Sequence, residues 1–449
     1  MNAHAIPFDT QIAENGSADS TMGSILTRER HKSLMLRAWI AAGLFYMALP
    51  GTLLGFSNLM AIATHHGLGA LSPAWIQGHG HAQVFGWIGS FVLGIGFYSQ
   101  PTIKDRSVIR LPLACFLLWT VGVGLRWAAS IYGWHWRILL PVSGAMELGA
   151  IQLFLMAASQ HKLPGNGEKS APRRGIELWM STVLVGTAGL TVAVFFNLVE
   201  CIRLAIAGTA PAFPHGLDQR YLVLLAWGFL TPFVWGFSAR WLPSFLAIPK
   251  PHERLMRTAV SLAVAGVLAG LAGFALAATI LLLVSAVAIA PALHLLERPH
   301  GKAKVQGIHP SFPVFARLSY LWLAIAAALG VWAAVADQHG GIWGASRHAL
   351  TVGFAANMVF TIGPRILPHF SGVRALFSKR LMLLSLVLLQ VGCTLRVGSE
   401  PLAYEGIASL AWKTLPVSGM LELSAVLVFA LNMGLTVLGG QSAFAENQG

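Results

Sequence analysis

The chain has 449 residues, of which 55% are hydrophobic and only 10% are charged, and its mean hydropathy is +0.66. Soluble proteins carry about a quarter charged residues, so this composition excludes a soluble protein and indicates an integral membrane protein. The formal net charge of +13 is typical of basic cytoplasmic loops in such proteins, and nucleic acid is not expected as a partner. Long apolar runs, in place of short alternating segments, favour helices over a β-barrel.

Twelve apolar stretches are long enough to cross the hydrocarbon layer of a membrane, which is roughly 30 Å thick. The expected spans are 36–60, 79–100, 109–131, 138–159, 176–200, 220–246, 257–275, 277–297, 314–336, 346–369, 380–398 and 412–437. They form a single membrane domain over residues 36–437, embedded in membrane lipid. Residues 1–35 are polar and have no apolar core of the kind a secretory signal needs, so they are expected to form a disordered cytoplasmic tail. Residues 438–449 are expected to form a short cytoplasmic tail.

The distribution of basic residues predicts the orientation of the chain. When the loops between the twelve spans are assigned alternately to the two sides, most of the 30 Lys and Arg residues fall on the side of the N-terminus. Cytoplasmic loops carry the excess of basic residues in membrane proteins. Both termini are therefore predicted to be cytoplasmic.

Several spans resemble one another in sequence, which indicates an internal repeat. Leu140-Pro-Val-Ser-Gly-Ala-Met-Glu147 in the fourth span matches Leu415-Pro-Val-Ser-Gly-Met-Leu-Glu422 in the twelfth. His81-Ala-x-x-x-Gly in the second span matches the segment that begins at His348 in the tenth. Repeated spans of this kind predict equivalent structural units.

The sixth span matches the tenth without a gap. Gly228-Phe and the following Arg240-x-Leu-Pro motif match Gly353-Phe and the motif that begins at Arg365. Spans 2, 6 and 10 are then equivalent, and the predicted fold is an all-α membrane protein of about 12 transmembrane helices in three pseudo-repeated four-helix units. The expected units are residues 36–160, 176–297 and 314–437.

His81 and His348 occupy the same place in two equivalent spans. Ionisable groups inside a bilayer are costly and are functional candidates when they face the interior of the bundle. Two inward-facing imidazoles on separate helices meet the requirement of a bis-histidine haem or of a metal centre between helices. The alternative is that each histidine only forms a hydrogen bond to a neighbouring helix.

His79 lies two residues before His81, which is about 200° around an ideal helix. The two side chains therefore cannot face one centre unless His79 precedes the helix. His79 is a candidate ligand of a second metal, for which copper suits imidazole, or a residue that caps the span.

Four further ionisable residues lie in repeat-matched spans. Arg126 and Arg396 could hold anionic groups such as haem propionates, because a guanidinium group binds a carboxylate through two hydrogen bonds. Alternatively, they form ion pairs with Glu147 and Glu422. These two carboxylates lie well inside the membrane, where they could relay protons or shape a ligand pocket.

The histidine motifs resemble those of the NnrS family, which consists of 12-span, haem- and copper-associated bacterial inner-membrane proteins linked to nitric oxide metabolism and nitrosative stress. That family is distantly similar to subunit I of the haem-copper oxidases, in which histidines on the second and tenth helices ligate the low-spin haem. The resemblance implies a b-type haem with His81 and His348 as ligands, with copper as a further metal. The motifs are Trp75-Ile-Gln-Gly-His79-Gly-His81-Ala-Gln-Val-Phe85-Gly86-Trp87 and Arg347-His348-Ala-Leu-Thr-Val-Gly353, continuing through Arg365 to His369.

The sequence also departs from these families. Ala82 and Gln83 stand where NnrS proteins usually have an acidic residue and Met, and Ser346 stands where the oxidases have the first of two histidines. Spans 6 and 7 contain no histidine, so the three-histidine copper site of the oxidases is not expected.

The sequence thus predicts a haem-binding bacterial inner-membrane protein that handles nitric oxide or protects against nitrosative stress, with a respiratory electron donor as a partner. Whether nitric oxide would be turned over, sensed or only bound is left open. The alternative is a 12-span solute or proton transporter, in which Glu147, Glu422 and the two arginines line the path.

Overall fold

The computed structural model describes residues 31–99, 107–159, 176–303, 307–370, 373 and 375–446. Every regular element in these ranges is a helix. They contain twelve helices or helical runs long and apolar enough to cross a membrane, as the sequence predicts. The chain is therefore a helical, multi-pass membrane protein. The spans are His31–His65, Pro73–Ser99, Arg110–Tyr132, Trp136–Ser159, Leu178–Ala207, His215–Leu246, Glu253–Leu271, Ala275–Ala292, Phe312–Ala336, Gly341–Pro368, Lys379–Tyr404 and Ala411–Val437.

Most spans are single α-helices, and four contain an internal π-helical stretch. The single helices are α5 (Ser107–Tyr132), α6 (Trp136–Ser159), α7 (Leu178–Ala207), α10 (Glu253–Leu271), α11 (Ala275–Ala292), α12 (Phe312–Ala336), α15 (Lys379–Tyr404) and α16 (Ala411–Glu446). The composite spans contain η1 (Met47–Leu53) and α2 (Leu54–His65) in span 1; α3 (Pro73–His81), η3 (Ala82–Gly89) and α4 (Ser90–Ser99) in span 2; α8 (His215–Val223), η4 (Leu224–Leu230) and α9 (Thr231–Leu246) in span 6; and α13 (Gly341–His348), η5 (Ala349–Ala356) and α14 (Asn357–Phe370) in span 10. A short 3₁₀ helix, η2 (Leu68–Ala70), follows span 1.

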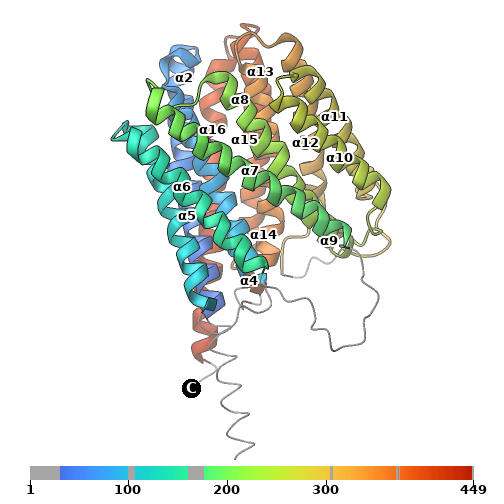
Figure 1. Cartoon of the computed structure of the whole chain (residues 1–449). Coiled ribbons are helices and arrows are strands. Elements are labelled where there is room, and N and C mark those ends of the chain that lie inside the picture. Colours follow the sequence, from blue (N-terminus) through green and yellow to red (C-terminus); the bar gives the residue numbers. More distant parts are fainter. Residues whose placement is uncertain are drawn as a thin grey trace, which may run out of the picture.

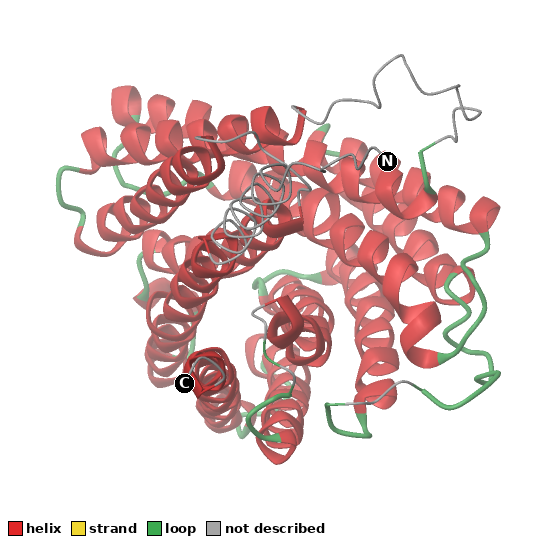
Figure 2. Cartoon of the chain, turned by 90° about the horizontal axis from the view of Figure 1, so that it is seen from below, coloured by secondary structure: helices red, strands yellow, loops and turns green. Residues whose placement is uncertain are grey.

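The spans form one bundle, with α2 and α13 at its upper end and α4 and α14 toward its lower end (Figure 1). Figure 2 views the bundle from below, with many helices nearly end-on. Because the number of spans is even, the chain enters the first span and leaves the twelfth at the same end. The histidines of spans 2 and 10 follow within nine residues of the helix starts at Pro73 and Gly341, and so lie in the upper half.

Spans 2, 6 and 10 are the most deeply buried. Between 61% and 67% of their most apolar windows is buried, compared with 33% for spans 3, 4, 5 and 7. Trp87 of span 2 packs on Phe360 of span 10 with ring centroids 6.1 Å apart, and Arg347 of span 10 hydrogen-bonds to Gln219 of span 6. These inner spans are apolar on most faces because other helices surround them.

The π-helical stretches of the inner spans begin at matching positions. They start one residue after His81 in span 2, one residue after Val223 in span 6 and one residue after His348 in span 10. A π-helical turn contains more residues than an α-helical one and is frequent at functional sites. In span 1, Pro50 lies within η1 and has no N–H to complete the α-helical hydrogen-bond pattern, which accounts for the local widening.

The structure shifts several expected helix boundaries. Span 2 begins at Pro73, after Ser72, whose hydroxyl accepts a hydrogen bond from the N–H of Ala74. His79 therefore lies within the helix and does not precede it. Span 11 continues to Tyr404, so that Glu400, beyond the expected end of that span, is helical and buried.

The predicted terminal tails fall partly outside the described residues. Residues 1–30 and 447–449 are outside, whereas residues 31–35 already belong to the first span. The helix α16 continues to Glu446, past the expected end of the last span at residue 437.

Candidate functional site

His81 is held in a buried hydrogen-bonded cluster between spans 2, 4 and 5. Its Nε2 lies 2.8 Å from Oε1 of Glu147, and Nδ2 of Asn197 donates to Oε2 of the same carboxylate over 3.0 Å. The side chain of His81 is 4% exposed and that of Glu147 is 0% exposed. Both oxygens of Glu147 therefore have a partner, and Nε2 of His81 is occupied by this contact.

Arg126 joins this cluster through a sulfur atom. Its NH1 donates to Sγ of Cys201 over 3.0 Å, and its guanidinium group lies 4.7 Å from the ring centre of Phe213. Among the described residues no ion pair joins Arg126 to Glu147, whose two oxygens bind His81 and Asn197. We call His81, Arg126, Glu147, Asn197 and Cys201 the His81 cluster.

His348 is bonded differently from His81. Its Nδ1 lies 2.9 Å from the backbone oxygen of Gly344, one turn earlier in α13, and 3.4 Å from Oε2 of Glu400. A carbonyl oxygen can only accept, so Nδ1 carries the proton and the neutral ring presents a lone pair at Nε2. Within the described part of the chain, Nε2 has no hydrogen-bond partner.

His79 has the same arrangement as His348. Its Nδ1 lies 2.9 Å from the backbone oxygen of Gly51 in span 1, which again leaves the lone pair on Nε2. The ring packs so closely on Gly55 that a Cβ atom there would lie 2.5 Å from Cε1 of His79. His348 and Arg396 are close enough to act on the charge of His79. As predicted from the helical period, His79 and His81 have different partners.

Arg396 is paired with a residue that the sequence analysis did not single out. Its NH2 donates to Oε1 of Glu400 over 3.2 Å, one turn later on α15. The spacing of four residues in Arg396-x-x-x-Glu400 is a recognisable signal, but the expected span ended at residue 398. The predicted alternative of an Arg396–Glu422 ion pair is not found, since Glu400 takes that place among the described residues.

Several polar atoms around His348 are buried and have no hydrogen-bond partner in the described structure. They are Nε and NH1 of Arg396, Oε2 of Glu400 and Oε1 of Glu422. Glu422 is half-buried, with its Oε1 atom buried, and it interacts electrostatically with His348, Arg396 and Glu400. We call His79, His348, Arg396, Glu400 and Glu422 the His348 cluster. Buried polar groups are nearly always paired, so unpaired ones here mark a place for a ligand.

Metal ligands do not gather in groups of three in the described chain, and the His348 cluster is no exception. No group of three or more His, Cys, Asp or Glu side chains that could hold a metal ion occurs among the described residues. His369 lies in α14, but its side chain is outside the described part. The fold and these two clusters define a polytopic helical membrane protein with ionisable groups buried between its inner spans.

One comparison with known proteins gives a match. Residues 242–438 match the family model of a domain of unknown function (DUF8744). This range includes His348, Arg396, Glu400 and Glu422 but neither histidine of span 2. No curated protein sequence matches the chain.

Proposed function

We propose that the chain is a haem-binding membrane protein in which His79 and His348 would hold the iron of a b-type haem between spans 2 and 10. The observation that carries the proposal is the shared bonding of these two rings. Each anchors Nδ1 on a backbone carbonyl and keeps the lone pair of Nε2 free. Metal-binding histidines commonly fix their orientation and tautomer in this way.

His79 replaces His81 in this proposal because Nε2 of His81 is already bonded to Glu147. Ligation through Nε2 would require that bond to break and would leave a buried carboxylate with one partner fewer. We assign His81 and Glu147 to packing and hydrogen bonding between spans 2, 4 and 5. Copper at His79 is not part of the proposal, since this imidazole is assigned to haem.

The remaining side chains of the His348 cluster fit an anionic cofactor. Nε and NH1 of Arg396 are unpaired donors that can bind a propionate carboxylate. Glu400 holds the other side of the same guanidinium and lies against His348, so it orients both groups. Haem, when bound, supplies a one-electron redox centre. Arg126 is expected to play no part in haem binding, because its contacts belong to the His81 cluster.

The proposed architecture remains three pseudo-repeated units of four helices. Each inner span presents two residues, two positions apart, just before its π-helical stretch: His79 and His81, Tyr221 and Val223, and Ser346 and His348. His79 and His348 belong to one cluster, and Tyr221 interacts electrostatically with Glu147 and Arg126 of the His81 cluster. Val223 and Ser346 line one cavity. Each pair of inner spans thus contributes residues to a common cluster or cavity, and this pattern supports a threefold arrangement.

We further propose nitric oxide as the small ligand and the bacterial inner membrane as the location, with both termini cytoplasmic. The motifs around His79 and His348 and their resemblance to the NnrS family support this part, together with the basic loops. A diatomic ligand would compete with His79 for the iron, because one carbonyl of another span holds this ring, whereas His348 has contacts to both Gly344 and Glu400.

The test is a spectrum of the detergent-purified protein, reduced minus oxidised, with iron and haem content measured on the same sample. The proposal expects sharp reduced α and β bands from a low-spin haem, which His348→Ala abolishes. Nitric oxide added to the reduced protein should then shift the Soret band. A wild-type protein that stays colourless and iron-free after haem supplementation would contradict the proposal. The buried, unpaired Oε1 of Glu422 would in that case favour the transporter alternative.

A further inference from the structure

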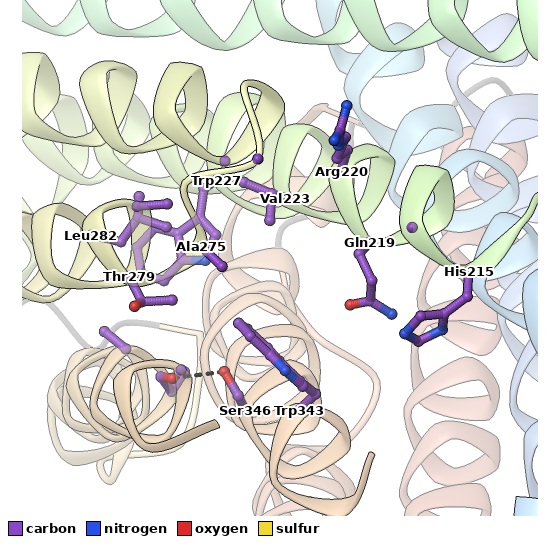
Figure 3. A pocket seen from close by; sticks show the side chains of 17 residues that line it. His215, Gln219, Arg220, Val223, Trp227, Ala275, Thr279, Leu282, Trp343 and Ser346 are labelled. Atoms are coloured by element: carbon purple, nitrogen blue, oxygen red, sulfur yellow. Dashed lines mark hydrogen bonds between the residues drawn. The ribbon is translucent and has the colours of Figure 1, made fainter. Parts of the chain in front are cut away.

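A cavity of about 320 Å³ lies between spans 6, 7, 8, 9 and 10 (Figure 3). It is formed near the upper ends of these spans, where Gly273 links α10 to α11 and where α8 and α13 begin. It contains neither of the two histidine clusters. Val223 and Ser346, which line it, occupy the positions that His81 and His79 have in span 2.

The walls of the cavity are mainly apolar. Val223 and Leu282 line it together with Ala326, and small residues on the surrounding helices leave the space open. Two indole rings, Trp227 of span 6 and Trp343 of span 10, also face it. Apolar and aromatic walls with a few polar groups are typical of small-molecule sites, and the volume is at the lower end of their usual range of roughly 300–1,000 Å³.

The helix α8 supplies the hydrogen-bond donors His215, Gln219 and Arg220 (Figure 3). Gln219 and His215 point toward one another, whereas Arg220, which is exposed and carries a permanent positive charge, points away from them. The hydroxyl groups of Ser346 and Thr279 donate to backbone carbonyls of their neighbours. No acidic residue lines the cavity. A ligand with oxygen acceptors suits these donors, and the charge of Arg220 disfavours a cation.

We infer that this cavity binds the head group of a membrane quinone. A quinone has a flat apolar ring that packs on tryptophan and carbonyl oxygens that accept from Arg220 and Gln219. The cavity lies inside a membrane-spanning bundle, where helices α10 and α11 contribute to its lining, and membrane quinones are dissolved in the surrounding lipid. The volume suits a single substituted ring and not a long acyl chain. The inference does not depend on haem at the His348 cluster.

The decisive variant fills the cavity. A Cβ atom on Gly330 would lie 3.5 Å from Oγ of Ser346 and 3.6 Å from Thr279, which is ordinary contact distance, so Gly330→Leu places its added carbons in the cavity. Ala328→Leu is the matched control, because Ala328 lies on the same helix and is exposed. Arg220→Gln is a second variant that leaves the cavity open and removes one charged donor; Arg220 is exposed.

The measurement is saturable binding of a short-chain ubiquinone analogue to the full-length protein in nanodiscs, followed by tryptophan fluorescence quenching. Wild type and Ala328→Leu should bind equally, Gly330→Leu at least tenfold more weakly, and Arg220→Gln about tenfold more weakly through loss of a charged hydrogen bond. Unchanged affinity in both Gly330→Leu and Arg220→Gln would overturn the inference. So would absence of saturable binding to wild type, or binding of palmitate at this site without binding of the quinone.

Discussion

The His81 and His348 clusters share a sequence motif but differ in how their polar atoms are bonded. In the first, both oxygens of Glu147 are paired, one with His81 and one with Asn197. In the second, the matching carboxylate, Glu422, keeps Oε1 buried and unpaired, and Arg396 has two unpaired nitrogens. The carboxylate of the first cluster is fully paired, and Nε of Arg126 is the one buried atom of that cluster without a partner in the described structure. The second has free bonding capacity, which is what a binding site requires.

A single residue difference accounts for much of this contrast. Glu400 follows Arg396 by four residues, whereas Ser130 follows Arg126 by four. Glu400 therefore accepts the hydrogen bond from Arg396 and contacts His348. Oε1 of Glu422 is left without a hydrogen-bond partner. In the His81 cluster Arg126 has no such neighbour and bonds to Cys201 instead. Helices of similar sequence thus place similar residues in unlike environments.

The largest effect on stability is expected for Glu147→Ala. It removes the acceptor of both His81 and Asn197 and leaves buried polar groups unpaired, which costs about 3 kcal/mol or more. Glu422→Ala should cost much less in the haem-free protein, because that carboxylate has an unpaired oxygen. Thermal unfolding of the two haem-free variants in one detergent measures the difference. Equal losses would remove the contrast between the clusters.

Gly55→Ala tests whether His79 must keep its position. The new Cβ would lie 2.5 Å from the ring of His79, so the ring must shift, at a cost of about 1–3 kcal/mol for overpacking. We expect an altered haem spectrum as well as a lower melting temperature. Gly80→Ala is the control, since a Cβ atom there meets nothing within 4 Å. Identical haem spectra in wild type and Gly55→Ala would argue against His79 as a ligand.

Arg396→Gln and Arg126→Gln separate the two arginines. Removing the charge of Arg396 beside the proposed haem should stabilise the oxidised form and lower the midpoint potential, by an energy on the order of 1 kcal/mol. Arg126→Gln should leave that potential unchanged, because Arg126 belongs to the His81 cluster. A redox titration of both variants gives the answer, and a larger shift for Arg126→Gln would reverse the assignment.

The smallest effect is expected at the surface. Arg203 pairs with Glu200 over 3.0 Å, but its side chain is 66% exposed, and such pairs contribute at most about 1 kcal/mol. Arg203→Ala should therefore change the melting temperature little and the haem spectrum not at all. A strong spectral change in this variant would mean that long-range effects, and not the His348 cluster, control the spectrum.

The number of spans could be predicted from the sequence because apolar length alone decides whether a helix can cross a membrane. The helix ends were harder to predict. Pro73-Ala-Trp and Ser399-Glu400-Pro401 are polar or proline-containing segments that are nevertheless helical. Glu400 was missed for this reason. A polar residue near the end of a span is not distinguished from a loop by hydropathy.

The pairing of side chains could be predicted only in part. The helical period shows that His79 and His81 face different neighbours. It does not show which of them keeps Nε2 without a partner, because that depends on how spans 1 and 4 pack against span 2. The contacts of Asn197 with Glu147 and of Cys201 with Arg126, which join two predicted units, could not be predicted for the same reason.

The central claim is that His79 and His348, and not His81, hold the haem. The most direct test is the reduced-minus-oxidised spectrum, with haem content, of wild type, His79→Ala, His81→Ala and His348→Ala after identical haem supplementation. The account predicts a wild-type low-spin spectrum in His81→Ala, a changed coordination state in His79→Ala and loss of haem in His348→Ala. A low-spin spectrum that survives in His79→Ala and disappears in His81→Ala would contradict it.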